Sequence, residues 1–430
     1  MNIPFSENCS EYDVIVCGGG PAGCCAAIAA ARSGVKVLLT EATSALGGMG
    51  TMGMVSAFAP FTDGEKLIYR SVPVEILERY KKRMGIPEYK WDWIKLSPED
   101  LKRVYDDTVT ESGAEVLFQS SVCSAETENR RIKRIYIAGK GGLKAYRAKV
   151  FIDCTGDGDL AAFSGVPFEI GQDGEVQSSS LCFAVGNVHT DKINIKINSN
   201  FDDGIWPKII SDGKYPLITR HFIPVMFGDT LIVNGGHLYI ENPTDSGEIS
   251  KAYILGRKTA EQYITALKEY LPEAFKDSYL VETAPLIGVR ESRRIKGKYT
   301  ITLDDYVNRR SFDDEIARNS YWLDCHSAAN GKNSTEIKID NTYKKGDSHG
   351  IPFRCLIPEN IRNLLVAGRC ISVERAVLSS TRVMPNCLAT GEAAGIGAAL
   401  AVKTNTDACY INGTQVRKIT EEKQAIQPKF

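Results

Sequence analysis

The sequence predicts an α/β fold, in which a parallel sheet with a β-meander is interrupted by an inserted α+β domain. Residues 12–41 show a strand, a glycine-rich turn, a helix and a second strand in immediate succession. Four strand-like segments follow between residues 115 and 153, and a last buried strand at 364–367 precedes a helix rich in small residues. The aromatic segment 185–345, punctuated by Pro and Gly, separates these parts and is typical of an inserted domain.

Composition and charge exclude several classes of protein. Of 430 residues, 43% are hydrophobic and 24% are charged, which argues against global disorder. Lys and Arg (52) nearly cancel Asp and Glu (53), so an electrostatic nucleic-acid binder is disfavoured. The least polar stretch, 388–402, is interrupted by Glu392 and is too short for a membrane span. With no basic, apolar leader and no Cys-x-x-Cys pair, we expect a cytoplasmic protein.

The first turn has the composition and context of a dinucleotide-binding turn. Residues 12–17 are an apolar strand, Gly18, Gly20 and Gly23 follow at the spacing G-x-G-x-x-G, and residues 24–33 are Ala-rich and favour a helix. Gly18 permits a tight turn, Gly20 lets a pyrophosphate approach the backbone, and Gly23 lets the helix pack closely on the sheet. The helix N-terminus then offers free N–H groups to the phosphates.

An acidic residue ends the second strand. The strand at 35–39 is followed by Glu41, which we expect to accept hydrogen bonds from the adenosine ribose. Its carboxylate would repel a 2′-phosphate, so NADP is disfavoured, but these residues do not separate FAD from NAD. The glycine-dense stretch 46–53 comes next and suits a backbone that passes tightly over a long ligand.

With further motifs, the chain resembles the glutathione-reductase-like FAD-dependent oxidoreductases, a group that includes fumarate reductase flavoprotein subunits. The matching residues are 14–23, Glu41 with Gly47 and Gly48, 151–158, 288–294, 351–358, 363–369 and 389–395. The resemblance implies a Rossmann-like FAD-binding domain with non-covalent FAD, and a cap domain over the flavin ring. It implies the following domains: FAD-binding parts at 1–56, 101–184 (with the meander) and 346–405, a mainly helical insertion at 57–100, a substrate or cap domain at 185–345, and a tail at 406–430.

The resemblance also assigns cofactor contacts. It places Thr155 and Gly156 near the pyrophosphate, the backbone of Val122 at the adenine, and the N-terminus of a helix at 389–402 under the flavin pyrimidine. A helix N-terminus would stabilise the negative charge of reduced flavin. Many relatives have an acid where this chain has Arg369. The full expected set is Gly18, Gly20, Pro21, Ala22, Gly23, Glu41, Ala42, Gly47, Gly48, Met49, Gly50, Thr51, Val122, Thr155, Gly156, Gly368, Arg369, Asn386 and Gly391.

Four residues are candidates for the chemistry. Arg290 stands in a run with two further arginines, and Arg382 lies just before the segment expected beside the flavin. Arg binds carboxylates through two hydrogen bonds, so we expect these two to orient an anionic group. His349 and His237 lie in glycine-containing loops, and an imidazole could move a proton at neutral pH; chain order alone favours His349. For both, an ordinary loop histidine is the competing interpretation, and a solvated basic face is the competing interpretation for Arg290.

The predicted activity is a two-electron, hydride-type oxidation or reduction of a small organic substrate, which the arginines predict to be anionic. The alternatives are a tRNA-modifying flavoprotein, an electron-transfer protein, or a protein that keeps FAD for structure. No metal site is expected, because the histidines form no ligand pair and residues 153–164 lack the Glu that ends a calcium loop. Expected partners are the substrate and an electron donor or acceptor, with neither nucleic acid nor membrane; the oligomeric state is left open.

Overall fold

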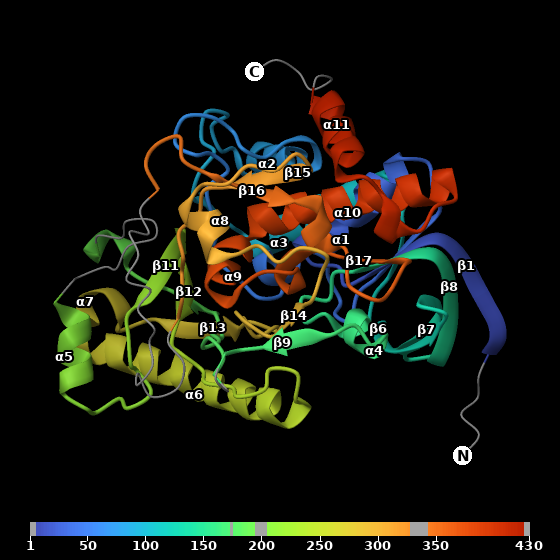
Figure 1. Cartoon of the computed structure of the whole chain (residues 1–430). Coiled ribbons are helices and arrows are strands. Elements are labelled where there is room, and N and C mark those ends of the chain that lie inside the picture. Colours follow the sequence, from blue (N-terminus) through green and yellow to red (C-terminus); the bar gives the residue numbers. More distant parts are fainter. Residues whose placement is uncertain (1–5, 173–174, 194–203, 327–342, 425–430) are drawn as a thin grey trace.

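The core of the protein is a sheet of seven strands. The structure is a computed structural model, and it describes residues 6–172, 175–193, 204–326 and 343–424. The strand order is β5-β2-β1-β8-β7-β6, with β17 beside the end of β8 (Figure 1). The parallel strands are β5 (Glu115–Leu117), β2 (Val37–Thr40), β1 (Ser6–Cys17), β8 (Gly142–Asp153) and β17 (Leu364–Val366). Antiparallel β6 (Ser121–Glu128) and β7 (Arg131–Gly139) complete the predicted meander with the start of β8.

The pairing register brings distant parts of the chain to one edge of the sheet. Cys17 at the end of β1 pairs with Asp153 at the end of β8, and Asp153 pairs with Val366 at the end of β17. The turns that follow these three strands therefore lie side by side. Ligands of open α/β sheets bind in the crevice at these carboxyl ends.

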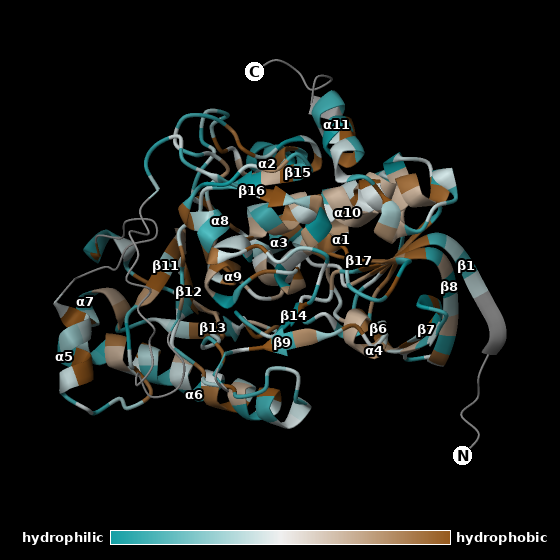
Figure 2. Ribbon diagram, in the orientation of Figure 1, coloured by the Kyte–Doolittle hydropathy of each residue, from teal (hydrophilic) through white to brown (hydrophobic). Residues whose placement is uncertain are grey.

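Two helices, α1 (Pro21–Arg32) and α10 (Met384–Thr404), pack on each other through small residues. A Cβ on Gly391 would lie 2.0 Å from the carbonyl oxygen of Ala22, and one on Gly395 would lie 2.2 Å from that of Ala26. Only glycine allows so close an approach of the two backbones. Figure 2 shows brown, hydrophobic strands around β17, where this pair of helices meets the sheet.

The predicted start of the second helix was wrong. We expected it at residue 389, whereas α10 begins at Met384 directly after the short helix α9 (Arg375–Thr381). Pro385 lies in the first turn of α10, where its missing N–H costs no helical hydrogen bond. The segment after Arg382, which we expected beside the flavin, is therefore the helix N-terminus itself.

The segment that follows the first glycine turns contributes a small hairpin and helices beside the sheet. The strands are β3 (Ala57–Phe58) and β4 (Ile94–Lys95), and the helices are α2 (Ser71–Met84) and α3 (Pro98–Glu111). Ser97 caps α3 by accepting a hydrogen bond from the backbone N–H of Asp100. The remaining helices near the sheet are α4 (Asp159–Phe163) and α11 (Gly413–Gln424).

A second layer, the cap, is built on a four-stranded antiparallel sheet of order β11-β12-β10-β13. Its strands are β10 (Phe183–Gly186), β11 (Phe222–Phe227), β12 (Thr230–Gly235) and β13 (Tyr279–Thr283), and its helices are α5 (Ile205–Ser211), α6 (Ser246–Tyr270) and α7 (Pro272–Phe275). The cap has its own aromatic core, in which the rings of Trp206 and Phe222 lie 4.8 Å apart. Figure 1 shows the cap to the lower left of the main sheet.

The chain leaves the cap sheet at residue 283, well before the predicted cap limit of 345. Strand β14 (Arg293–Ile295) pairs with β9 (Phe168–Ile170), and β15 (Glu315–Asn319) pairs with β16 (His349–Pro352). Ile295, Ile301 and Tyr306, the last in α8 (Leu303–Val307), belong to the same hydrophobic core as the parallel strands.

Short 3-10 turns are η1 (Gly48–Gly50), η2 (Thr190–Lys192), η3 (Phe353–Leu356), η4 (Gly368–Cys370) and η5 (Ala408–Tyr410). No helix in the described part of the chain has the length and apolar character needed to cross a bilayer.

Candidate functional site

A large cavity, of about 1080 Å³, connects the carboxyl ends of the parallel strands with the cap. Its lining starts at the first glycine turn, with Gly18 and Gly20, passes Thr155 and Gly368, and ends under the cap at Arg290. Sites for drug-sized ligands enclose about 300–1,000 Å³. A cavity slightly larger than this range has room for an extended dinucleotide with space beside it.

Two glycines of the first turn, Gly18 and Gly23, leave no room for a Cβ. Gly18 has a φ of 96°, and a Cβ there would lie 2.5 Å from the carbonyl oxygen of Cys154. A Cβ on Gly23 would lie 1.7 Å from the carbonyl oxygen of Gly18. Helix α1 starts at this turn with no side-chain cap and no acid in its first turn, so its N–H groups and positive dipole end are available to a phosphate.

Glu41 is fastened to the same turn. One carboxylate oxygen accepts a hydrogen bond from the backbone N–H of Gly19 at 2.6 Å, and the other accepts one from Thr43 at 2.7 Å. The side chain is buried but lines the cavity. A carboxylate has about four lone-pair sites, so two remain for ribose hydroxyl donors.

A second helix N-terminus opens on the cavity further along. Val383, Met384 and Cys387 of α10 line it, and the first turn of α10 has no acidic residue and no side-chain cap. The N-termini of α1 and α10, which carry the positive ends of the helix dipoles and no side-chain cap, thus face one cavity. This arrangement suits a ligand whose centre is anionic and whose ring becomes negatively charged when it is reduced.

The predicted cofactor residues fall into two groups. Those that line the cavity are Gly18, Gly20, Pro21, Ala22, Glu41, Ala42, Gly48, Met49, Val122, Thr155, Gly156, Gly368 and Arg369. Those that do not line it are Gly23, Gly47, Gly50, Thr51, Asn386 and Gly391. The second group shapes the wall from behind: the Thr51 hydroxyl donates to the carbonyl of Leu46 at 2.6 Å, and the Asn386 amide donates to that of Thr381 at 2.7 Å.

Arg369 is tied down at its unusual position after the strand. It donates to a carboxylate oxygen of Asp157 and to the hydroxyl of Ser292, both at 2.6 Å. Asp157 lines the cavity beside it, so a carboxylate is present near the expected ribityl chain although it comes from the turn after β8. The pair keeps this part of the wall close to neutral.

Under the cap, three arginines and one carboxylate line the same end of the cavity. Arg382 donates to the backbone carbonyl of Asp324 at 2.8 Å and approaches its carboxylate at 3.7 Å. Arg290 donates to the carbonyl of Ser178 at 2.8 Å and to the hydroxyl of Ser180 at 3.0 Å, and no described acid forms an ion pair with it. We call Arg220, Arg290, Arg382 and Asp324, with His237 and His326, the cationic cluster.

Two histidines belong to this cluster. Arg220 lies 2.6 Å from Nε2 of His237, which lies 3.2 Å from Nδ1 of His326. Nε2 of His326 lies 3.3 Å from the carboxylate of Asp324. In the described residues, here or elsewhere, no three potential metal ligands converge. We therefore consider the two histidines as groups that can bind or release a proton.

The surroundings keep both imidazoles neutral. Burial, with the positive charges of Arg220 and Arg290, lowers the pKa of His237 to about 3. Burial lowers the pKa of His326 to about 4, against the opposing effect of its hydrogen bond with Asp324. Burial alone would raise the pKa of Asp324, but the contacts with His326 and Arg382 overcome it and hold that pKa well below its usual range. The cluster therefore carries a net positive charge at neutral pH.

Our preferred proton carrier from the sequence, His349, is not in the cavity lining. It is fully buried in β16, where its Nδ1 lies 2.5 Å from the hydroxyl of Tyr343 and its ring packs on Tyr306. Burial and the nearby Arg318 lower its pKa to about 3. These contacts are those of a core residue, and they remove the basis for a catalytic role.

The arginine run also separates. Only Arg290 reaches the cavity; Arg293 pairs with Asp159 at 2.7 Å, and buried Arg294 pairs with Glu291 at 2.7 Å. Sequence reasoning missed Arg220, Asp324 and His326 as site residues. The Asp-x-His spacing of the last two, beside Tyr and Trp, was a usable signal, whereas Arg220 has none that we recognise.

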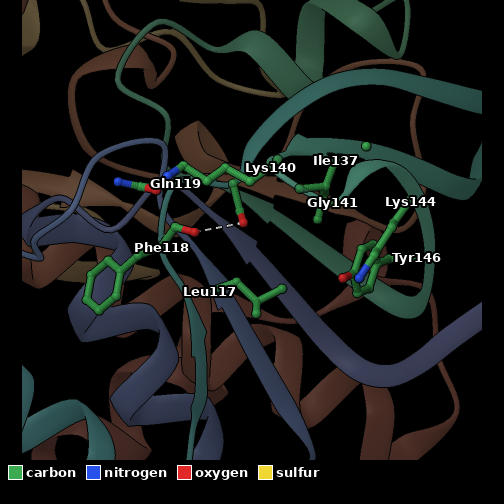
Figure 3. A pocket seen from close by; sticks show the side chains of 11 residues that line it. Leu117, Phe118, Gln119, Ile137, Lys140, Gly141, Lys144 and Tyr146 are labelled. Carbon is green, nitrogen blue, oxygen red and sulfur yellow. Dashed lines mark hydrogen bonds between the residues drawn. The ribbon is translucent and has the colours of Figure 1, made fainter.

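A second hollow lies between the segment that follows β5 and the turn that joins β7 to β8. It encloses about 160 Å³ and is lined by residues such as Phe118, Lys140 and Tyr146 (Figure 3). It is too small for a dinucleotide, and its side chains form no constellation that we can assign to chemistry.

A family model described as FAD dependent oxidoreductase matches residues 13–420. The chain belongs to this family. FAD is its cofactor, and the uncapped helix ends, the close backbone contacts at Gly18 and Gly23 and the placement of Glu41 fit that group. The chain is a flavoprotein with a Rossmann-like domain, as the sequence predicted.

One solved structure agrees at the level of fold, and two others are similar at lower scores. The flavin-dependent brominase Bmp2 superposes with a TM-score of 0.50 at 12% identity, over 96% of this chain and 84% of that one. The p-nitrophenol 4-monooxygenase PnpA from Pseudomonas putida has a TM-score of 0.47 at 11% identity, over 96% and 85%. A geranylgeranyl bacteriochlorophyll reductase-like protein from Thermoplasma acidophilum has a TM-score of 0.46 at 15% identity, over 96% and 83%. No curated protein sequence matches the chain.

Proposed function

We propose that this flavoprotein catalyses a two-electron oxidation or reduction of a small organic carboxylate that binds between the flavin and the cap. The observation that carries the proposal is the cationic cluster, in which three arginines and the carboxylate of Asp324 line the cap end of the cofactor cavity, and only Arg382 approaches that carboxylate. A buried excess of positive charge is costly unless an anion balances it. A substrate carboxylate would provide that balance.

Arg290 and Arg382 are the residues that would bind the carboxylate. Arg290 donates to protein oxygens through one terminal nitrogen and Arg382 through both, which fixes the plane of each guanidinium. The remaining N–H groups, Nε–H among them, are left for a ligand. Arg382 also donates to the side-chain oxygen of Gln177 at 3.0 Å and to the carbonyl of Arg290 at 3.1 Å. The two arginines are thus connected and would orient the substrate together.

His326 is the residue that would handle the proton, in place of His349. It lines the cavity and is oriented by Asp324, and its neutral imidazole can accept a proton from a substrate hydroxyl or amine. A bound carboxylate would offset the arginines and raise the pKa of His326 towards neutrality. Bound FAD would supply the two-electron chemistry.

The test is a set of binding titrations on the FAD-loaded protein, followed through the visible flavin absorption. The probes are benzoate and its neutral counterpart benzyl alcohol, and the variants are Arg290→Met and the control Arg103→Met on the exposed surface of α3. A hydrogen bond to a charged group contributes about 1.5–3 kcal/mol, so we expect Arg290→Met to weaken benzoate binding by roughly tenfold to a hundredfold. The control should bind benzoate like the wild type. Equal affinity for benzoate and benzyl alcohol in the wild type would contradict the proposal.

The same protein separates the alternatives left open by the sequence. Rapid bleaching of the flavin by NADH or NADPH would favour reduction of an acceptor by nicotinamide. Retention of RNA in a gel-shift assay would favour a tRNA-modifying role. A flavin that neither substrate nor nicotinamide can reduce would favour a structural role.

A further inference from the structure

An aromatic wall stands beside the cationic cluster. It consists of Trp93, Tyr321 and Trp322, and all three line the cavity. The rings of Tyr321 and Trp322 stack at 4.3 Å between centroids, and the ring of Trp93 lies 5.5 Å from that of Trp322. The wall and the cluster share one stretch of chain, because Asp324 of the cluster lies two residues after Trp322 of the wall. Arg382 donates a hydrogen bond to the backbone carbonyl of Asp324 in this stretch.

Hydrogen bonds to one residue, Thr62, fix the backbone on both sides of this wall. The carboxylate of Asp92, next to Trp93, accepts hydrogen bonds from the backbone N–H and the hydroxyl of Thr62 at 3.0 and 2.6 Å. The hydroxyl of Ser320, next to Tyr321, donates to the carbonyl of Thr62 at 2.8 Å. The two segments are therefore tied together before any ligand binds, which lowers the entropy cost of binding.

Two features of the wall are costly for the folded chain. Trp322 keeps 41% of its surface exposed although it is a large aromatic residue. Trp93 has a φ of 53°, a left-handed conformation that bulky residues rarely adopt. Such backbone strain concentrates at ligand sites, where the surrounding structure maintains it. Packing of the core explains neither feature, because both rings face the cavity.

We propose that the aromatic wall receives the ring of the substrate, so that the enzyme acts on ring-bearing carboxylates rather than on open-chain ones. This inference rests on the proposed function for the carboxylate end. The wall supplies flat apolar faces for the body of the substrate, while Arg290 and Arg382 hold its charge. The stacking of a ligand ring on Trp322 would cover the surface that is now exposed.

The experiment compares ring and chain probes of matched carbon count on the FAD-loaded protein. The carboxylates are benzoate, cyclohexanecarboxylate and heptanoate, and the neutral probes are benzyl alcohol and heptanol. The variants are Trp322→Leu, the conservative Trp322→Phe, and the control Tyr410→Leu, which changes an exposed aromatic residue outside the cavity lining. FAD content and circular dichroism show that each variant is folded.

We expect the wild type to bind benzoate roughly tenfold more tightly than heptanoate, as one stacking contact allows. Trp322→Leu should remove this ring preference without weakening heptanoate, Trp322→Phe should restore most of it, and Tyr410→Leu should leave it unchanged. Absence of a ring preference in both the acid and the alcohol series, or an equal loss for ring and chain in Trp322→Leu, would overturn the inference. A ring preference with no preference for acids over alcohols would instead refute the proposed function, and would still support ring binding at the aromatic wall.

Discussion

The buried His349 makes the stability of the protein depend on pH, with a magnitude that follows from its pKa. The side chain is fully buried and its pKa is lowered to about 3, whereas an unfolded histidine titrates near 6.5. Between these values the unfolded chain binds a proton that the folded chain does not, so stability falls as the pH falls. Over the interval from about pH 7 to about pH 5, this one residue should cost the folded state about 2 kcal/mol.

The assay is urea unfolding of the FAD-saturated protein at these two pH values. His349→Gln removes the titrating group, so its loss of stability on acidification should be smaller than that of the wild type by about 2 kcal/mol. Tyr343→Phe is the matched control, because it removes the hydroxyl that contacts Nδ1 but keeps the imidazole and its pH dependence. If His349→Gln and the wild type lose the same free energy of unfolding between the two pH values, the conclusion that His349 stays buried and neutral in the folded protein is wrong.

Two further substitutions test the cofactor domain. Gly391→Ala would place a Cβ 2.0 Å from the carbonyl oxygen of Ala22, so α1 and α10 must separate; we expect a loss of about 1–3 kcal/mol in urea unfolding, and unchanged stability would contradict the close packing. The two carboxylate oxygens of Glu41 accept hydrogen bonds from the backbone N–H groups of Gly19 and Thr43. In Glu41→Gln, an amide NH₂ group, which donates, takes the place of one of these acceptor oxygens. Calorimetry should then show FAD binding weakened by roughly tenfold, with FMN binding, which needs no adenosine contact, little changed. Equal losses for FAD and FMN would place the adenosine elsewhere.

The cofactor half of the fold was predictable because its signals are local. The strand, glycine turn and helix at residues 12–32 are adjacent in sequence, and the close contacts that require Gly18 and Gly23 form within the same turn. The later strand that ends at Val366 was found because a buried apolar run followed by Gly is a strong pattern. Parallel pairing then brings these turns together without further information.

The cap end of the site was less predictable because its members come from distant loops. Arg220, Arg290 and Asp324 meet only in the fold, and no spacing in the sequence links them. His349 was preferred on its position in the chain, but its neighbours in space are Tyr343 and Tyr306, which bury it. Chain order places a residue near a domain, and only packing decides whether its side chain faces the cavity or the core.

The most direct measurement is an experimental structure of the protein with FAD and benzoate bound. We predict the adenosine ribose at Glu41, the flavin ring at the N-terminus of α10, and the benzoate carboxylate on Arg290 and Arg382. A flavin ring located away from these arginines, or benzoate bound with its carboxylate turned from them, would contradict the proposed site.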